Sequence, residues 1–321
     1  MIHALWLLLG LVLLTVGGES LIRGALAMAK RIGISPLLAG LVIVGFGTSA
    51  PELVVSLQAA ISNQPEIAIG NVVGSNIANI LLILGLSALI MPLVTDAQCL
   101  KRDGLTMLFA TVLFMVLASF GGLARWEGLI MLACLTAYLI WAYRTEREDT
   151  SSPEAQLHQA EFDEIDVKPM SLPLILLATI SGLLLLIAGA NRFLLGAVGL
   201  GQALGIPEVI IGLTVVAVGT SLPELAVSVI AAIRKHADVA VGNIIGSNIF
   251  NIFCILGISS IIHPLPLEGR LLHTDQFVML GAAVMLLVFL FFGLRLSRLK
   301  GVLLLAGYVA YITAMFGMQS A

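Results

Sequence analysis

Two glutamates lie in the middle of long apolar stretches, where a charged side chain is unexpected. Glu52 ends the sequence Gly-Thr-Ser-Ala-Pro-Glu, and Glu224 ends the sequence Gly-Thr-Ser-Leu-Pro-Glu. A carboxylate at the centre of a membrane span costs about 3 kcal/mol on insertion scales, so such groups persist where something binds them. The proline before each glutamate removes a backbone donor, and we expect this to leave the carbonyls of Gly47 and Gly219 free to face a cavity.

The two motifs belong to a sequence that occurs twice. Residues 40–93 align with residues 212–265 without a gap, and 30 of the 54 positions are identical. Each residue of the second copy has a number that exceeds that of its equivalent in the first copy by the same amount, and we call this difference the repeat offset. The identical pairs include the polar residues and glycines that are unusual in apolar sequence: Thr48/Thr220, Ser49/Ser221, Pro51/Pro223, Glu52/Glu224, Gly70/Gly242, Asn71/Asn243, Ser75/Ser247, Asn76/Asn248, Asn79/Asn251 and Gly85/Gly257. This duplication predicts two copies of one structural unit.

The spacing of the polar residues predicts a shell made of oxygen atoms. Thr48 and Glu52 are four residues apart, as are Ser75 and Asn79, so each pair shares one face of a helix. The second copy contains the equivalent residues Thr220, Glu224, Ser247 and Asn251. If these faces converge, they bring together carboxylates, hydroxyls, carboxamides and spare carbonyls. Hard cations such as calcium favour such a shell, whereas zinc and copper favour histidine or cysteine, and none of the five histidines lies in the repeated motifs.

The same residues also have a purely structural interpretation. Serine and asparagine side chains often form hydrogen bonds between membrane helices, so Ser75, Ser247 and the asparagine pairs are equally compatible with packing. Gly70 and Gly74 have the spacing of close-packing residues, as do their equivalents in the second copy. Packing explains the glutamates less well, because two acids that each follow a proline occupy equivalent positions within their spans.

The composition is that of a membrane protein. The mean hydropathy is +1.08, and 11% of the 321 residues are charged, compared with about a quarter in soluble domains. The net charge of −3 argues against nucleic acid as a partner. Cys99, Cys134 and Cys254 lie in or beside apolar runs without CxxC spacing, which favours packing over disulfides or metal binding. The first apolar run follows only Met-Ile-His, which favours a retained span over a signal peptide.

Ten apolar runs are long enough to cross a bilayer as helices. The predicted spans are 3–28, 35–61, 67–91, 103–121, 125–143, 171–200, 207–233, 239–262, 275–295 and 300–318. The one long polar connection is acidic, and it divides the chain into a first five-helix repeat (1–143), an acidic cytoplasmic linker (144–170) and a second five-helix repeat (171–321). We therefore predict an all-α integral membrane protein with ten transmembrane helices, in which helices 2 and 7 are broken.

Five spans per repeat require the second repeat to cross the membrane in the opposite direction to the first. Basic residues test this prediction because they favour cytoplasmic loops. With the N-terminus outside, 13 of the 16 basic residues lie at inner connections: Arg23, Lys30, Arg31, Lys101, Arg102, Arg144, Arg147, Lys168, Arg234, Lys235, Arg295, Arg298 and Lys300. The outer connections contain Arg125 and Arg270. This distribution predicts inverted-topology repeats with both termini outside.

The motif GTSAPE with GNVVGSNIANILLILG, and the motif GTSLPE with GNIIGSNIFNIFCILG, resemble the two alpha-repeats of the sodium/calcium exchanger family. This family is part of the cation/calcium antiporter superfamily, and the resemblance is to its prokaryotic type. The resemblance implies ten helices in an inverted pair of five, with a central site between spans two, three, seven and eight where calcium and sodium compete. It also implies that spans one and six slide past the rest and switch access.

By position, the resemblance implies a set of cation ligands. Glu52 and Glu224 would bind both calcium and sodium, and Thr48 and Thr220 would add backbone and hydroxyl oxygens. The implied sodium sites contain Ser49, Ser75, Ser221 and Ser247, the carbonyls that cap them belong to Gly45 and Ala217, and the middle of the site is completed by Asn79 and Asn251.

Asparagine at both positions 79 and 251 departs from many relatives, which carry an aspartate at one of them. Two glutamates alone give the site a charge of −2, which balances one calcium ion or two monovalent ions. A glutamate can also take up a proton when its cation leaves. The stoichiometry and the coupling ion therefore stay open.

We expect a secondary active antiporter that exchanges calcium for sodium across the membrane by alternating access. A proton-coupled calcium/cation exchanger on the same scaffold is the alternative, and a passive cation channel is a third possibility that the inverted repeat disfavours. We expect neither an enzyme nor an ATP-driven pump, because no Walker-type GxxxxGK[ST] loop is present.

The expected partners follow from this function. They are Ca²⁺ and Na⁺, or H⁺, as transported ions together with the lipid bilayer. No permanently bound cofactor and no obligatory protein partner are expected. The compact chain favours the inner (plasma) membrane of a prokaryote.

Overall fold

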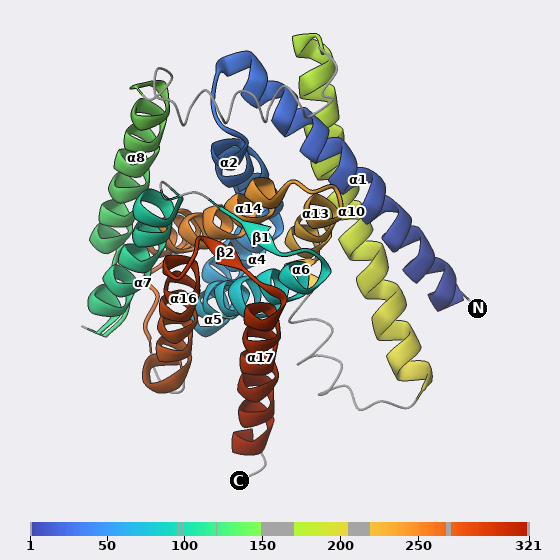
Figure 1. Cartoon of the computed structure of the whole chain (residues 1–321). Helices are drawn as coiled ribbons and strands as arrows, with labels where there is room; N and C mark the ends of the chain where they lie inside the picture. The colour runs from blue at the N-terminus through green and yellow to red at the C-terminus, as the bar shows by residue number, and fades with distance from the viewer. Residues whose placement is uncertain are drawn as a thin grey trace.

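The structure, a computed structural model, is almost entirely helical (Figure 1). It describes residues 2–95, 97, 99–119, 121–148, 170–204, 219–267 and 271–319. The first half contains α1 (Ile2–Ile32), α2 (Pro36–Ala39), η1 (Gly40–Gly45), α3 (Phe46–Thr48), α4 (Ala50–Ile61), α5 (Pro65–Ala78), η2 (Asn79–Leu84), α6 (Gly85–Ile90), β1 (Leu93–Val94), η3 (Cys99–Gly104), α7 (Leu105–Ala118) and α8 (Arg125–Glu148). The second half contains α10 (Leu172–Ala203), α13 (Leu222–Ile233), α14 (Ala237–Phe250), η6 (Asn251–Leu256), α15 (Gly257–Ile262), η7 (Leu271–Asp275), α16 (Gln276–Phe291), β2 (Arg295–Leu296) and α17 (Arg298–Gln319). The η elements are turns of π-helix.

The elements recur at the repeat offset. The bounds of α4 and α13, of α5 and α14, and of α6 and α15 are related by this offset at both ends. The π-helical turns η2 and η6 are related in the same way, and η3 and η7 begin at equivalent positions. The duplicated sequence therefore folds into equivalent elements, including turns of an uncommon helix type.

Local sequence explains where several helices begin and end. Pro36 and Pro65 stand in the first turns of α2 and α5, where a missing backbone N–H costs no hydrogen bond. The hydroxyl of Ser35 accepts a hydrogen bond from the backbone N–H of Leu38 at 3.1 Å and so caps α2. Gly33, with a φ of +72°, follows the end of α1 in the left-handed conformation that glycine tolerates best. The reversal from α1 into α2 is therefore encoded locally.

Within the described residues, seven helices are long and apolar enough to cross a membrane. The bent pair Pro36–Thr48 and Ala50–Ile61 makes eight if it is counted as one span. Each predicted span contains helix, although only residues 219–233 of the predicted span 207–233 are described. α8 continues to Glu148, five residues beyond its predicted end, and residues 149–169 of the predicted linker lie outside the described residues.

α1 and α10 lie side by side as a long pair (Figure 1). Glycines spaced seven residues apart line their contact: Gly10, Gly17 and Gly24 in α1, and Gly182, Gly189 and Gly196 in α10. A Cβ atom added at Gly17 would lie 2.8 Å from the backbone nitrogen of Leu186, and one added at Gly189 would lie 2.7 Å from that of Leu14. Glycine therefore brings these two backbones closer than any side chain would allow.

Two short strand contacts join the halves of the chain. β1 pairs with β2 in antiparallel fashion, with Leu93 opposite Leu296. Leu123 forms an antiparallel bridge with Leu265, which is the second copy's equivalent of Leu93. The connection that follows α6 thus pairs with the connection that precedes α17. In the same way, the connection that follows α15 pairs with the connection that precedes α8.

Two arginines make equivalent contacts between the halves. The side chain of Arg125, at the start of α8, donates to the carbonyl of Ile261 near the end of α15 at 3.1 Å. The side chain of Arg298, at the start of α17, donates to the carbonyl of Leu89 near the end of α6 at 3.2 Å. A cation near a helix C-terminus is favourable, so each arginine stabilises the last turn of a helix in the other half.

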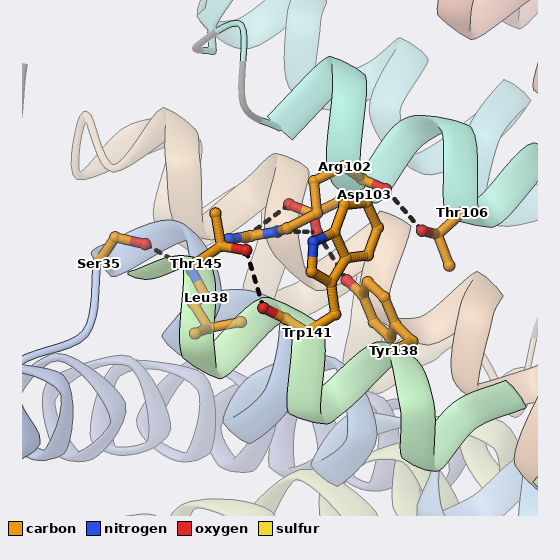
Figure 2. Close-up of polar contacts among 8 residues, drawn as sticks. All are labelled: Ser35, Leu38, Arg102, Asp103, Thr106, Tyr138, Trp141 and Thr145. Carbon is orange, nitrogen blue, oxygen red and sulfur yellow. Dashed lines mark hydrogen bonds and ion pairs between the residues drawn. The ribbon is translucent and has the colours of Figure 1, made fainter. Parts of the chain in front are cut away.

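A buried ion pair lies at the start of α7 (Figure 2). The guanidinium of Arg102 contacts the carboxylate of Asp103 through two hydrogen bonds, at 2.7 and 3.0 Å, and both side chains are almost inaccessible to solvent. The hydroxyl of Tyr138 in α8 donates to the same carboxylate at 2.8 Å. In the second half, the hydroxyl of Tyr311 donates to Asp275 at 3.2 Å, and a threonine takes the place of the arginine. The aspartate–tyrosine contact is thus common to both halves.

Candidate functional site

The glutamate motif lies where the second predicted span is broken. α3 ends at Thr48 and α4 begins at Ala50, and the two parts of the span are bent by 43°. Pro51 occupies the first turn of α4, where its missing N–H is tolerated. In the second copy α13 begins at the equivalent residue, Leu222, with Pro223 in its first turn. The break predicted at helix 2 is therefore present, whereas most of the segment before α13 lies outside the described residues.

One expectation about the break is wrong. The carbonyl of Gly47 was expected to be free, but the backbone N–H of Ser49 contacts it. The same N–H also contacts the carbonyl of Gly45 at 3.2 Å. Pro51 has no backbone N–H to donate. The turn at Ser49 compensates for this, because it directs the N–H of Ser49 toward the carbonyls of both Gly45 and Gly47.

Glu52 and Glu224 are completely buried, each in the first turn of its helix. The hydroxyl of Ser221 donates to Oε1 of Glu52 at 3.1 Å, and the hydroxyl of Ser49 donates to Oε1 of Glu224 at 2.9 Å. Each glutamate is thus held by the serine of the other copy. The first turn of a helix also favours negative charge, since its backbone N–H groups point toward it.

The threonine of the first copy lies against the second. The hydroxyl of Thr48 donates to Oδ1 of Asn243 at 3.1 Å and lies 3.3 Å from the carbonyl of Gly45. The hydroxyl of Ser247 donates to the same carbonyl at 3.0 Å. Gly45 therefore supplies the carbonyl at which hydroxyls of both copies meet.

The equivalent contacts around the threonine of the second copy are described only in part. The hydroxyl of Thr220, which is half-buried, donates to Oδ1 of Asn71 at 3.5 Å. Ser75 is buried at the position equivalent to Ser247. The carbonyl equivalent to that of Gly45 belongs to Ala217, which lies outside the described residues.

Four asparagines form a reciprocal network at the contact of α5 and η2 with α14 and η6. The side-chain amide of Asn76 donates to the backbone carbonyl of Asn248 at 3.2 Å. The side-chain amide of Asn248 donates to the backbone carbonyl of Asn76 at 3.4 Å. The side-chain amide of Asn79 donates to the side-chain oxygen of Asn248 at 3.0 Å. The side-chain amide of Asn251 donates to the side-chain oxygen of Asn76 at 3.0 Å. The amide nitrogens of Asn79 and Asn251 are thereby engaged, which fixes the orientation of their oxygens.

Within the part of the chain that the structure describes, four buried oxygens of the repeated motifs have no hydrogen-bond partner. They are one carboxylate oxygen of each glutamate and the amide oxygens of two asparagines: Glu52 Oε2, Glu224 Oε2, Asn79 Oδ1 and Asn251 Oδ1. Leaving such an atom unpaired in a protein interior costs about 1–3 kcal/mol, and more for a charged group. All four accept only, and in the described residues no three histidine, cysteine, aspartate or glutamate side chains converge. Their chemistry is that of ligands for a hard cation.

Close packing of the backbone brings the two copies together here. A Cβ atom added at Gly45 would lie 2.8 Å from the carbonyl oxygen of Asn243 and 2.9 Å from the nitrogen of Ser247. η1 and α14 are therefore in direct backbone contact, which places the carbonyl of Gly45 beside the polar residues of the second copy.

Four further residues of the site were not among the predicted ligands, although hydrogen bonding between helices was the alternative interpretation of the asparagine pairs. They are the inner pair of asparagines, Asn76 and Asn248, and the pair that contacts the threonines, Asn71 and Asn243. Their identity at the repeat offset was the available signal. Which side chains they contact depends on the approach of the two copies, and no local spacing shows that.

Comparisons with known proteins bear on the family of the chain. A family model described as sodium/calcium exchanger protein matches residues 2–144 and 174–317. The chain is 36% identical over 349 residues to the sodium/calcium exchanger MaX1 of Methanosarcina acetivorans, with 98% of this chain and 99% of that protein covered. It is 35% identical over 320 residues to the putative antiporter CaxA of Alkalimonas amylolytica, with 98% and 99% covered.

A solved structure of the sodium-calcium exchanger NCX_Mj, soaked with 2.5 mM Na⁺ and 0.1 mM Ca²⁺, superposes with a TM-score of 0.82 at 32% identity. The similarity covers 98% of each chain. The repeated glutamate motifs, the helical fold and these matches lead to one conclusion. This chain is a member of the sodium/calcium exchanger protein family.

Proposed function

We propose that this membrane protein is a secondary active antiporter that exchanges calcium for sodium by alternating access. The observation that carries the proposal is that four buried oxygens of the repeated motifs, two from each copy, have no hydrogen bond in the described residues. A shell of this composition suits a hard cation. Membership of the exchanger family supports the same conclusion.

The proposed ligands are those of the two repeated motifs. Glu52 and Glu224 bind whichever cation is present, and Asn79 and Asn251 supply amide oxygens at the middle of the site. The remaining proposed ligands are Thr48, Thr220, Ser49, Ser221, Ser75, Ser247 and the carbonyls of Gly45 and Ala217. The described hydrogen bonds support this set, because the donors of Asn79 and Asn251 already face protein groups and leave their oxygens for the ion.

Competition between the two ions produces exchange. The two carboxylates supply a charge of −2, which one calcium ion or two sodium ions neutralise. Both ions use the same two glutamates, so calcium leaves when sodium enters. Ser49 and Ser221 hold one oxygen of each carboxylate, so that the second oxygen faces the ion.

Access to the site alternates, in this proposal, through two inverted repeats of five spans. The recurrence of equivalent elements and of reciprocal contacts at the repeat offset supports this topology. α1 and α10 slide past the rest as one unit. The repeats are residues 1–143 and 171–321, joined by a cytoplasmic linker at 144–170, with both termini outside a prokaryotic inner membrane.

Flux measurements test the function. The full chain is reconstituted in vesicles, and uptake of radioactive calcium is measured under an outward sodium gradient or under a pH gradient alone. We expect uptake with sodium and none with the pH gradient. Uptake driven by the pH gradient alone would identify the proton-coupled exchanger, and calcium leak without any counter-ion would contradict antiport.

A further inference from the structure

Asn71 and Asn243 lie one layer behind the proposed ligands and contact both copies of the repeat. The amide of Asn243 donates to the backbone carbonyl of Glu224 at 3.3 Å and to the hydroxyl of Ser228 at 2.9 Å. A carbonyl can only accept, so the nitrogen of the Asn243 amide must face Glu224. The amide oxygen is thereby left to face the other copy.

That oxygen accepts the proton of a threonine from the other copy. Oδ1 of Asn243 lies 3.1 Å from the hydroxyl of Thr48, in the turn just before α4. A threonine hydroxyl has one proton and two acceptor lone pairs. When the proton points at Asn243, the lone pairs are left for a cation. A hydroxyl with its proton directed at the cation would repel it.

The equivalent contacts exist around Asn71. Its amide donates to the carbonyl of Glu52 at 3.2 Å and to the hydroxyl of Ser56 at 2.9 Å. Its Oδ1 accepts from Thr220 at 3.5 Å. The longer distance and the half-buried threonine make this the weaker of the two contacts.

We propose that Asn71 and Asn243 are positioning residues of the cation site, each holding the glutamate backbone of its own repeat and orienting the threonine hydroxyl of the opposite repeat toward the ion. This proposal rests on the cation site proposed above. Groups that orient ligands in this way typically change ion affinity by about 10- to 100-fold when they are removed. Asn243 should act mainly through Thr48, and Asn71 through Thr220.

A double-mutant cycle on the full purified chain tests the proposal. The variants are Asn243→Ala, Thr48→Val and the double variant, with Thr48→Ser as the conservative substitution. Calcium affinity is read from the calcium dependence of the melting temperature. We expect Asn243→Ala and Thr48→Val each to weaken calcium binding about tenfold. We expect the double variant to be no weaker than the weaker single variant, and Thr48→Ser to stay close to the wild type.

Thr111→Val is the matched control for the loss of a buried hydroxyl. Thr111 is buried in α7, which contributes none of the proposed ligands, and its hydroxyl donates to the carbonyl of Met107 in its own helix. We expect it to leave calcium affinity unchanged. If Asn243→Ala does not fold, the same cycle is run with Asn71→Ala and Thr220→Val, where the effects should be smaller.

Two results would overturn the positioning role while leaving the proposed function intact. One is an unchanged calcium affinity in the asparagine variants when Thr48→Val is impaired. The other is a double variant whose loss equals the product of the two single losses, because independent effects add in free energy. If the wild type shows neither calcium-dependent stabilisation nor exchange, both the proposed function and this inference fail.

Discussion

The centre of the molecule and the α1–α10 pair are held together by different kinds of contact. At the centre, the two copies are joined by directional hydrogen bonds between buried side chains, such as those from Ser49 to Glu224 and from Ser221 to Glu52. In the α1–α10 pair, backbone lies directly against backbone at glycines. Directional bonds fix the distance between a few named atoms, whereas glycine contacts fix two helices to each other along their length.

The pair also contacts the rest of the molecule through side chains. A partly exposed ion pair at 3.0 Å links Glu19 of α1 to Arg234 at the end of α13. Such surface pairs contribute between about 0 and 1 kcal/mol. The proposal of alternating access assigns the motion to this pair and the ion binding to the centre, and each region can be disrupted separately.

Removing a glutamate charge should have the largest effect. We expect Glu52→Gln and Glu224→Gln each to abolish calcium–sodium exchange, because the proposed site loses half of its charge. Radioactive calcium uptake into vesicles measures this loss. Glu66→Gln is the matched control, since Glu66 is an exposed glutamate in the first turn of α5. Near-normal exchange in either site variant would exclude that glutamate as an essential ligand.

Forcing α1 and α10 apart should lower stability next. In Gly17→Ala the added Cβ meets the backbone of α10 at 2.8–2.9 Å, so the helices must shift. Overpacking of this kind costs about 1–3 kcal/mol and should lower the Tm of the purified protein. Gly281→Ala introduces the same methyl group into α16, where no atom lies within 4 Å, and should leave the Tm unchanged. Equal melting temperatures for the two variants would mean that the pair is loosely packed.

Removing one serine should weaken binding without destroying the site. Ser49→Ala and Ser221→Ala each remove the hydroxyl that holds the carboxylate of the other copy. A hydrogen bond to a charged group contributes about 1.5–3 kcal/mol, so we expect calcium affinity to fall at least about tenfold. Calcium titration monitored by thermal stability measures it. A loss confined to one of the two variants would show that the copies hold their glutamates differently.

The arginines that cap helices of the other half should have the smallest effect. Arg125→Ala and Arg298→Ala each remove a cation from a helix C-terminus, a contribution of about 0.3–1 kcal/mol. We expect a small decrease in Tm for both variants and no change in calcium affinity. A change in affinity would show that the ends of α6 and α15 communicate with the centre.

The sequence alone predicted the break in helix 2 and the polar residues around it, for a physical reason. In an apolar chain each acid, proline or asparagine is costly, so residues that persist at equal positions in two copies must have a use. Glu52, Ser49 and Thr48 stood out in this way, and the structure brings all three against residues of the second copy.

The remaining features depend on tertiary structure. The proline motif shows which donor is missing but not where the neighbouring N–H groups point, so the prediction of a free Gly47 carbonyl was wrong. Arg102 was assigned to an inner connection and Asp103 to the start of the predicted span 103–121, and neither assignment shows that the two residues pair beneath α8. The cross-copy contacts of Asn243 likewise have no local signature.

The π-helical turns η2 and η6 begin at Asn79 and Asn251, at the same place in both copies. Such turns are rare and are often found at functional sites. The two copies therefore share a local widening of the backbone as well as a sequence, and each copy presents its asparagine from the first residue of that widened turn.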